Sequence, residues 1–381
     1  MAIFITGATG FIGSYVVAEL LREHQERLAL LVRARSIEEA EKRLWMPLQL
    51  HLDFERFIDL MKSRVDVYLG DLTRPQLGLC PSDRARLIDS TESVIHLGAA
   101  LNRRSDKVCF NVNLRGTLEV IKLARSAHED HGLRRFSSVS TSAVCGERRC
   151  ELIAEAQSVD WRLEDYDPYA RTKKFGELMV SELLPDVSTI VFRPSTVMGD
   201  SRFAETIEFD MVRAFVVLAH LPVLPLDPKA RHDIVPVDFV ARSIATIHQR
   251  EKPKYDIYHL SAGRDSLSYQ EMIDAMRIKG FRIPHLFVPR LGRQASAIVN
   301  YLATTPKNWG VSLPATLLKM FWPYLIFDTV FDNQRVKEEM GESPTPFSEY
   351  AYRLLQFAVK HNFSYPYKPW PETTISKRED G

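Results

Sequence analysis

Short apolar runs alternate with segments of helical periodicity along the first 262 residues. Apolar runs bounded by turn residues predict strands, and the helical segments between them predict crossover connections. Strands and helices in alternation predict a parallel sheet covered by helices on both faces, which is a doubly wound α/β fold. The predicted strands are 2–6, 28–32, 64–69, 93–97, 135–139, 188–193 and 258–261.

The turn after the first strand is rich in glycine and leads directly into a predicted helix. It reads Gly7-Ala8-Thr9-Gly10-Phe11-Ile12-Gly13. Glycines at such a junction let backbone amides approach a pyrophosphate, which the positive end of the helix attracts. Three glycines can also mark an ordinary tight turn, but the strand before them and the helix after them favour a Rossmann-like dinucleotide site. The predicted cofactor contacts in this turn are Gly7, Thr9, Gly10, Phe11, Ile12 and Gly13.

The second predicted strand ends in Arg33-Ala34-Arg35. In dinucleotide-binding sheets the residue at this place faces the adenosine ribose. A carboxylate there accepts from the 2′-hydroxyl, whereas arginine accommodates a 2′-phosphate. Because no acid stands here, Arg33 and Arg35 predict NADP(H) rather than NAD(H). The alternative is that both arginines are solvated turn residues.

Three further segments are expected at the same edge of the sheet. An aspartate after the third strand can bond adenine, although an aspartate that follows glycine is also common in turns. Small residues after the fourth strand would let the ribose lie against bare backbone, and a Pro-Ser-Thr segment after the sixth strand would form a wall for the nicotinamide. The predicted contacts are Asp71, Leu72, Gly98, Ala99, Ala100, Asn113, Pro194, Ser195 and Thr196.

A hydroxyl cluster and a tyrosine–lysine pair supply candidate chemistry. The fifth strand ends in Ser140-Thr141-Ser142, and Tyr169 and Lys173 begin a predicted helix. Residues four apart share one helical face, so the cation is expected to draw the phenol pKa from about 10 toward neutrality, where the phenol can exchange a proton. Such clusters and pairs are often simple caps and surface residues. Their combination with the glycine turn favours a catalytic site.

Composition limits the partners. Lys plus Arg number 50 and Asp plus Glu 49, so no global charge attracts nucleic acid or an anionic membrane. No stretch matches a membrane span; the closest, 313–331, is predicted to be core, with an apolar substrate lining or peripheral membrane contact as alternatives. Four cysteines without metal or disulfide spacing predict a reduced, cytoplasmic protein without a metal site. His96, inside a strand, is predicted to be a core histidine.

The glycine turn, Gly70-Asp71-Leu72, Ser140-Thr141, Tyr169 with Lys173, and Arg193-Pro194-Ser195 together resemble the extended short-chain dehydrogenase/reductase superfamily. The resemblance covers residues 1 to about 262. It implies that Thr141 holds a substrate carbonyl and that Tyr169 donates a proton. It also implies that Lys173 lowers the pKa of Tyr169 and binds the nicotinamide ribose.

Within this superfamily the chain is most similar to thioester reductases, namely fatty acyl-CoA reductases and the reductase domains of carboxylic acid reductases and nonribosomal synthetases. The similarity lies in residues 31–35, 139–141 and 327–333, with Gly98 in place of the usual alanine and Cys145 in place of an aromatic residue. It implies NADPH-dependent reduction of a small-molecule or carrier-linked acyl thioester to an aldehyde or alcohol. The oligomeric state is not readable from the sequence.

Other functions on the same fold are open alternatives. One is a sugar-nucleotide epimerase or a hydroxysteroid-type dehydrogenase, and another is a non-catalytic NADP-sensing protein. A dehydratase has less support because Ser142-Ala143 stand where those enzymes place an Asp-Glu pair. The retained pair of Tyr169 and Lys173 speaks against the sensing protein.

These patterns divide the chain into two parts and a tail. Residues 1–200 are predicted to form the NADP-binding Rossmann domain, to which 232–262 return. Residues 201–231 and 263–370 are predicted to form a smaller, mostly helical substrate-binding part. Residues 371–381 are expected to be a flexible tail.

Overall fold

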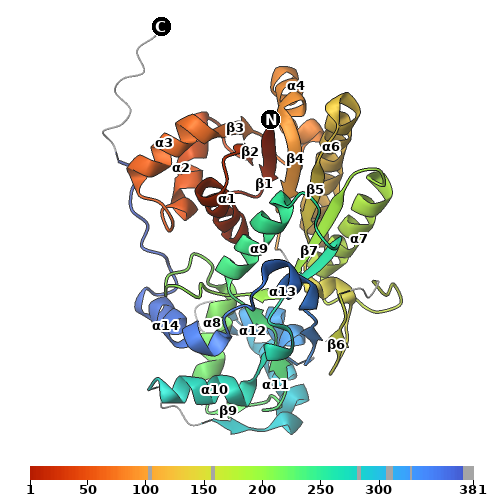
Figure 1. Ribbon diagram of the computed structural model, residues 1–381. Coiled ribbons are helices and arrows are strands. Elements are labelled where there is room, and N and C mark those ends of the chain that lie inside the picture. The colour runs from red at the N-terminus through yellow and green to blue at the C-terminus, as the bar shows by residue number, and fades with distance from the viewer. Residues whose placement is uncertain (102–104, 156–158, 281–284, 306–311, 327, 372–381) are drawn as a thin grey trace.

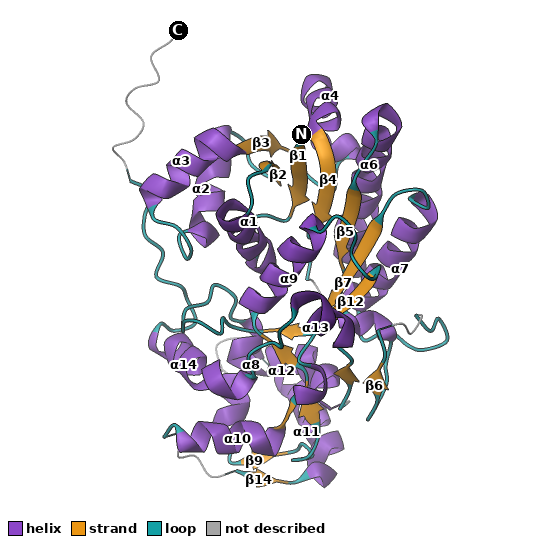
Figure 2. Cartoon of the chain, in the orientation of Figure 1, coloured by secondary structure: helices purple, strands orange, loops and turns teal. Residues whose placement is uncertain are grey.

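A seven-stranded parallel sheet forms the centre of the protein. The computed structural model describes residues 1–101, 105–155, 159–280, 285–305, 312–326 and 328–371. The strand order, β12-β7-β5-β4-β1-β2-β3, confirms the predicted doubly wound α/β fold (Figure 2). Because every pair is parallel, all strands end at one edge of the sheet, where such folds bind ligands. The strands are β1 (Ala2–Thr6), β2 (Arg27–Val32), β3 (Val65–Leu69), β4 (Thr91–His96), β5 (Arg135–Val139), β7 (Thr189–Pro194) and β12 (Ile257–Leu260).

Helices cover both faces of this sheet (Figure 1). Successive side chains of a strand point to opposite faces. Ile3 and Ile5 therefore pack into one apolar cluster, with α1 (Phe11–Glu23), α2 (Ile37–Leu48), α3 (Phe54–Arg64) and α9 (Val237–Gln249). Ala2 and Phe4 pack into the other, with α4 (Pro81–Ser90), α6 (Gly116–His131) and α7 (Pro168–Leu183). Burial on both faces is why the strands are nearly continuous apolar runs.

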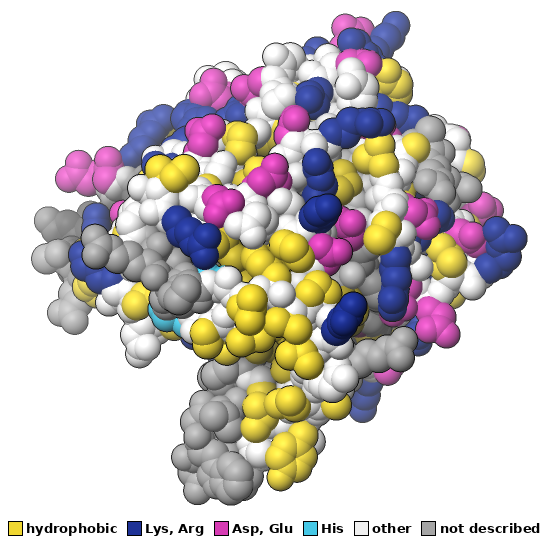
Figure 3. All heavy atoms as spheres, turned by 90° about the horizontal axis from the view of Figure 1, so that it is seen from below, with side chains coloured by type: hydrophobic (Ala, Val, Ile, Leu, Met, Phe, Trp, Pro, Cys, Tyr) yellow, Lys and Arg dark blue, Asp and Glu magenta, His cyan; other side chains and the backbone are white. Residues whose placement is uncertain are grey.

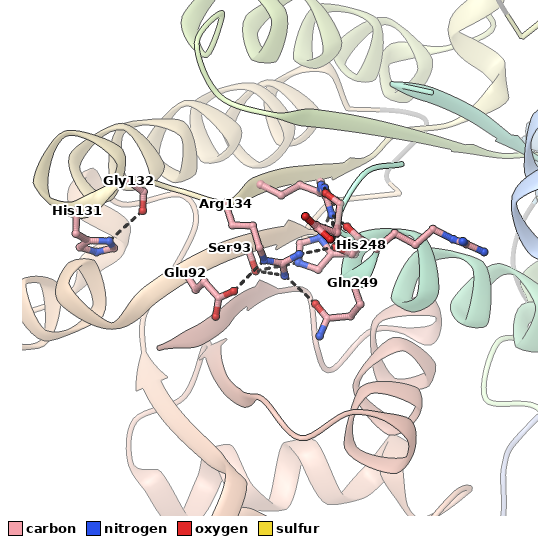
Figure 4. A network of polar contacts seen from close by, with 11 residues as sticks. Glu92, Ser93, His131, Gly132, Arg134, His248 and Gln249 are labelled. Carbon is pink, nitrogen blue, oxygen red and sulfur yellow. Dashed lines mark hydrogen bonds and ion pairs between the residues drawn. The ribbon is translucent and has the colours of Figure 1, made fainter. Parts of the chain in front are cut away.

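A polar network anchors α9 to the end of the sheet opposite the carboxyl edge (Figure 4). The Arg134 guanidinium donates to Glu92 at 2.9 Å, to the His248 carbonyl at 3.0 Å and to Gln249 at 2.7 Å. The His248 ring bonds the hydroxyls of Ser137 at 2.8 Å and Ser93 at 2.9 Å. Cations that bond the last carbonyls of a helix complement its negative end. The network therefore fixes the helix that supports α1, with which α9 packs.

A smaller, mostly helical part lies beyond the carboxyl edge of the sheet (Figure 1). Its apolar core is formed by α8 (Asp210–His220), α10 (Tyr269–Ile278), α12 (Ser312–Ile326) and α14 (Phe347–Lys360), with α11 (Gly292–Leu302) packed against α12. Phe321, Trp322 and Leu325 are buried, which confirms the prediction that this aromatic stretch is core. The remaining helices are α5 (Asp106–Cys109) and α13 (Gln334–Met340), and the short strands are β6 (Leu152–Ile153), β8 (Thr196–Val197), β9 (Val223–Leu224), β10 (Arg231–His232), β11 (Ile234–Val235), β13 (Leu267–Ser268), β14 (Leu286–Phe287) and β15 (Val330–Phe331).

Local features of the structure bear on several predictions. His96 is buried between the hydroxyls of Thr6 at 2.7 Å and Thr117 at 2.9 Å, as predicted for a core histidine. The segment before α6 forms a π-helical turn over Phe110–Arg115. None of the helices that the described residues form has the length and apolar character needed to cross a bilayer. All four cysteines are free. The predicted tail lies outside the described residues from position 372 onward.

The buried histidines make stability depend on pH. Burial lowers the pKa of His248 well below its ordinary value, so the folded state keeps this ring neutral. The unfolded chain takes up a proton below about pH 6.5, and stability is therefore lost as the pH falls from that value. We predict that His248→Gln reduces the pH slope of the unfolding free energy by about 1.4 kcal/mol per pH unit below pH 6. Urea unfolding at several pH values measures the slope, and an unchanged slope would contradict the assignment.

Candidate active site

The glycine turn is held against the backbone that follows β4. Gly7 has a φ of +80°, and a Cβ on it would lie 2.7 Å from the Gly98 amide nitrogen. A Cβ on Gly13 would lie 2.0 Å from the Gly7 carbonyl oxygen. Gly10 precedes α1 and caps it without a side chain, so the first amides of the helix face the turn. The turn is therefore a cradle that only glycine permits, and it suits a pyrophosphate.

A cavity of about 400 Å³ opens at the carboxyl edge of the sheet, beside this turn. Its volume lies in the range of ordinary ligand pockets. The sheet side of the cavity contains most of the residues that the sequence predicts for the nicotinamide end of a cofactor and for catalysis. These are Gly7, Gly10, Phe11, Ile12, Gly13, Ala99, Thr141, Tyr169, Lys173, Pro194, Ser195 and Thr196. The structure thus brings together groups from five separate segments of the chain.

Helix α7 carries two of the cavity's functional side chains, and buried contacts fix its position. Tyr169 and Lys173 are each 8% exposed. The Lys173 ammonium donates to the Val139 carbonyl at the end of β5, at 2.7 Å. Burial lowers the pKa of Lys173 to about 8, while the charge of Glu177 opposes that shift. One turn further along α7, Glu177 forms a buried ion pair of 2.6 Å with Arg193 of β7.

The end of β5 contributes two hydroxyls to the cavity. Thr141 Oγ1 accepts a hydrogen bond from the Ala143 amide at 3.3 Å, which leaves the hydroxyl proton able to bond a ligand oxygen. Ser140 Oγ is buried and has no hydrogen-bond partner among the described residues. Buried polar groups are nearly always satisfied in native proteins. An orphaned hydroxyl in this wall therefore fits a cavity that receives a polar ligand such as a dinucleotide.

The other predicted cofactor residues lie outside the cavity lining. Asn113 is buried and its side chain bonds the Ala100 backbone at 2.7 and 3.2 Å and the Thr172 hydroxyl at 3.0 Å. It joins the loop after β4 to α7, which is a positioning role that the sequence did not indicate. Contacts of Thr9, Leu72, Gly98, Ala100 and Asn113 with a cofactor stay predictions.

Arg33 and Arg35 are exposed at the end of β2, and Asp71 lies close to Arg33. Burial raises the pKa of Asp71, but hydrogen bonds from the Thr73 amide and hydroxyl, each 2.8 Å, and the charge of Arg33 lower it overall. One Asp71 oxygen thus accepts hydrogen bonds within its own turn, which is the alternative expected for an aspartate that follows glycine. The adenosine contacts of Arg33, Arg35 and Asp71 stay predictions.

A contact between the smaller helical part and α7 was not predicted. The Tyr324 hydroxyl of α12 donates to Asp167 at 2.7 Å, and the other Asp167 oxygen accepts from the Ala170 amide at 2.8 Å. Asp167 is the N-cap of α7, two residues before Tyr169. The Tyr324 ring also stacks on Tyr166, with centroids 4.8 Å apart. The aromatic character of 321–327 was the only signal for this contact, since its partners are separated by 157 residues.

The cavity lining also contains His232 and Asp233, which were not predicted from the sequence. Burial lowers the pKa of His232 to about 4, so its ring is neutral where it meets Thr196 Oγ1 at 3.2 Å. Burial raises the pKa of Asp233 to about 6, although its oxygens accept from the amides of Ala262 at 2.8 Å and Phe331 at 3.1 Å. Asp233, between β10 and β11, therefore joins the segment after β12 to β15 at the cavity wall.

The cavity combines a phenol, a cation and hydroxyls from the sheet edge and α7 with apolar side chains from other parts of the chain. Met211 and Phe321 supply apolar surface from the smaller part, and Phe331 supplies it from β15. This arrangement can polarise and protonate an oxygen atom beside the predicted nicotinamide site. The described residues contain no group of His, Cys, Asp and Glu that could hold a metal ion.

Comparison with known proteins identifies relatives of this chain. The sequence profile of the male sterility protein family, an NAD-binding family, matches residues 5–244. The chain is 28% identical over 300 residues to a carboxylic acid reductase of Mycobacterium tuberculosis, a match that covers 71% of this chain and 25% of the relative. It is 28% identical over 315 residues to an isonitrile lipopeptide synthase of the same organism, covering 74% of this chain and 12% of the relative. The chain therefore spans a quarter or less of the length of these two relatives.

Solved structures show the same fold. The terminal R domain of the myxalamid PKS-NRPS biosynthetic pathway aligns with a TM-score of 0.80 and 23% identity, covering 95% of this chain and 91% of that domain. A UDP-glucuronic acid 4-epimerase of Bacillus cereus aligns with a TM-score of 0.62 and 17% identity, covering 96% of this chain and all of the epimerase. The matched profile, together with this fold, shows that the chain belongs to the male sterility protein family, within the extended short-chain dehydrogenase/reductase superfamily.

Proposed function

We propose that the protein is an NADPH-dependent oxidoreductase that reduces an acyl thioester to an aldehyde or alcohol. One observation carries this proposal: the glycine cradle, Thr141, Tyr169 and Lys173 all line one cavity. A relative of this chain is named a carboxylic acid reductase, and a structural neighbour is an R domain, which supports acyl reduction. The four free cysteines fit a reducing compartment, and we place the activity in the cytoplasm.

The residues around the cavity have distinct tasks in this reaction. NADPH, bound over the glycine cradle, would supply the hydride. The hydroxyls of Thr141 and Tyr169 bond the thioester carbonyl oxygen and stabilise the negative charge that develops on it. Tyr169 then donates its proton to that oxygen, which gives a hemithioacetal. Collapse of the hemithioacetal releases an aldehyde and a thiol.

Lys173 supports Tyr169 electrostatically. Its ammonium is fixed by the Val139 carbonyl, and a pKa of about 8 leaves it mostly charged at neutral pH. A fixed cation one helical turn from the phenol favours loss of the phenolic proton. Lys173 also lies where it can bond the nicotinamide ribose, since both it and the glycine cradle line the cavity.

The substrate's acyl group is assigned to the apolar wall of the cavity. Phe321 and Tyr324 come from α12 and Met211 from α8, so the smaller helical part forms the acyl side. Residues 201–231 and 263–370 would then bind substrate, while 1–200 and 232–262 bind the cofactor. The thiol side of the substrate, on coenzyme A or a carrier protein, would extend to the exterior.

A sugar-nucleotide epimerase is the second candidate on this fold, and the alignment with a UDP-glucuronic acid 4-epimerase shows that the architecture permits it. Epimerases use NAD, for which an acid at the end of β2 is expected. Arg33 stands there instead. The lower similarity to the epimerase than to the R domain also favours the reductase.

The proton-donor role of Tyr169 can be tested by Tyr169→Phe. Loss of a general acid lowers the rate by about a hundredfold or more. We predict this loss in NADPH oxidation with an acyl-CoA panel, with unchanged NADPH affinity measured by cofactor fluorescence. Tyr324→Phe is a matched control, because it removes a phenolic hydroxyl from the same cavity. Loss of its one hydrogen bond should lower the rate of NADPH oxidation by only about fivefold. Equal effects of both variants would refute the assignment.

The cofactor preference can be tested by Arg33→Asp. An arginine bonded to a 2′-phosphate contributes about 1.5–3 kcal/mol, so the variant should bind NADPH about tenfold to a hundredfold more weakly. Affinity for NADH should change little, and Arg56→Asp, on the exposed side of α3, should alter neither. Equal affinity of the native protein for NADPH and NADH would contradict the preference.

A further inference from the structure

The smaller helical part exposes large apolar side chains on its outer end. We define the outer apolar surface by Ile278 at the end of α10, Leu286 and Val223 in β14 and β9, and Leu291, Ile298 and Tyr301 in or before α11. Ile278 is 87% exposed, Tyr301 68%, Leu286 62% and Ile298 58%. Figure 3, a view from this end of the molecule, shows hydrophobic side chains gathered on the face. An apolar gathering of this kind on a folded protein marks an interaction site.

Two of the elements that carry this surface, β14 and β9, lie side by side. Leu286 pairs with Val223 in the β14–β9 ladder, so the two exposed side chains are neighbours. Helix α11 turns Ala295 and Val299 toward the apolar core of the smaller part. Ile298 and Tyr301 are nevertheless exposed on the same helix. A helix that is apolar on more than its core-facing side is expected to have a second partner.

The charge of this region favours an anionic partner. Residues 275–327 contain seven basic residues and no Asp or Glu, which leaves 43 basic against 49 acidic residues in the rest of the chain. The seven are Arg277, Lys279, Arg282, Arg290, Arg293, Lys307 and Lys319. Arg277, Lys279, Arg290 and Lys319 are exposed in the structure, and Arg277 pairs at 3.4 Å with Asp274, which lies just before this stretch. Figure 3 shows Lys and Arg side chains beside the hydrophobic ones. The near-neutral charge of the whole chain conceals this local excess.

We propose that the outer apolar surface binds the interface of an anionic lipid membrane. Protruding aliphatic and aromatic side chains can enter the boundary between headgroups and acyl chains, while the surrounding basic residues are attracted to anionic headgroups. This is peripheral attachment. It involves different residues from the aromatic stretch 321–325, which is buried and faces the core and the cavity.

Membrane attachment at this place would present the substrate side of the cavity to lipid. Helix α11 packs on α12, and α12 lines the cavity through Phe321 and Tyr324. A hydrophobic acyl compound dissolved in or bound to the membrane would therefore be near the acyl wall. This consequence rests on the proposed function, whereas the lipid binding itself does not.

Vesicle sedimentation tests the proposal with the full chain. We expect the protein to sediment with phosphatidylcholine vesicles that contain phosphatidylglycerol and to remain unbound with phosphatidylcholine alone. High salt should weaken binding because it screens the basic residues. Arg290→Glu should weaken it by about fivefold or more, since one basic residue at an anionic surface contributes about 1 kcal/mol. The double variant Ile278→Glu/Leu286→Glu should weaken it more strongly.

Controls separate this surface from general effects. Leu183→Glu is matched to the double variant, because Leu183 is exposed at the end of α7 on the other part of the molecule. It should bind vesicles like the native protein, and circular dichroism should show that all variants are folded. The proposal is overturned by equal binding to neutral vesicles, by an equal loss in Leu183→Glu, or by binding of an acidic protein at this surface without any binding of vesicles.

Discussion

The placement of α7 against the sheet is the constraint on which the candidate site depends. Two buried charged contacts establish it: the Lys173 ammonium on the Val139 carbonyl and the Glu177 carboxylate on the Arg193 guanidinium. Buried charges are costly unless they are paired with good geometry. These contacts therefore allow little variation in how α7 lies on β5 and β7. The orientation of Tyr169, on the same helical face, follows from them.

The loops at the carboxyl edge are coupled to this helix by further contacts. Asn113 joins the segment after β4 to Thr172 of α7. Gly7 and Gly98 bring the glycine cradle against the same segment, at a distance that excludes a Cβ. The smaller helical part reaches the start of α7 through Tyr324 and Asp167. The cradle, the hydroxyl strand and the apolar wall are thus held in register by contacts to one helix, which is how a preorganised site is maintained.

Much of this arrangement could be predicted from the sequence because its causes are local. Strands buried on both faces are continuous apolar runs, and the strand before the glycine turn and the helix after it favour a dinucleotide site over an ordinary tight turn. Tyr169 and Lys173 were selected by their helical spacing in combination with the glycine turn and the hydroxyl cluster. The contact of Tyr324 with Asp167 could not be predicted, because it joins segments far apart in the chain. The same is true of Asn113, whose amide completes the packing of a loop.

The outer apolar surface illustrates another limit of sequence reasoning. The seven basic residues of 275–327 are visible in the sequence, but whole-chain charge balance hides them. Exposure of Ile278 and Ile298 is a property of the folded chain, since apolar residues at helical spacing usually face a core. The aromatic stretch, by contrast, was predicted to be core and is largely buried.

A crystal structure of the protein with NADP⁺ and a non-reactive acyl thioester would test the central claim most directly. We expect the diphosphate to lie over the glycine cradle and the thioester carbonyl oxygen to be within hydrogen-bond distance, about 2.6–3.2 Å, of both the Tyr169 and Thr141 hydroxyls. We also expect the acyl group to lie against Phe321 and Tyr324. A nicotinamide ring outside the cavity, or a Tyr169 phenol turned away from the carbonyl, would contradict it.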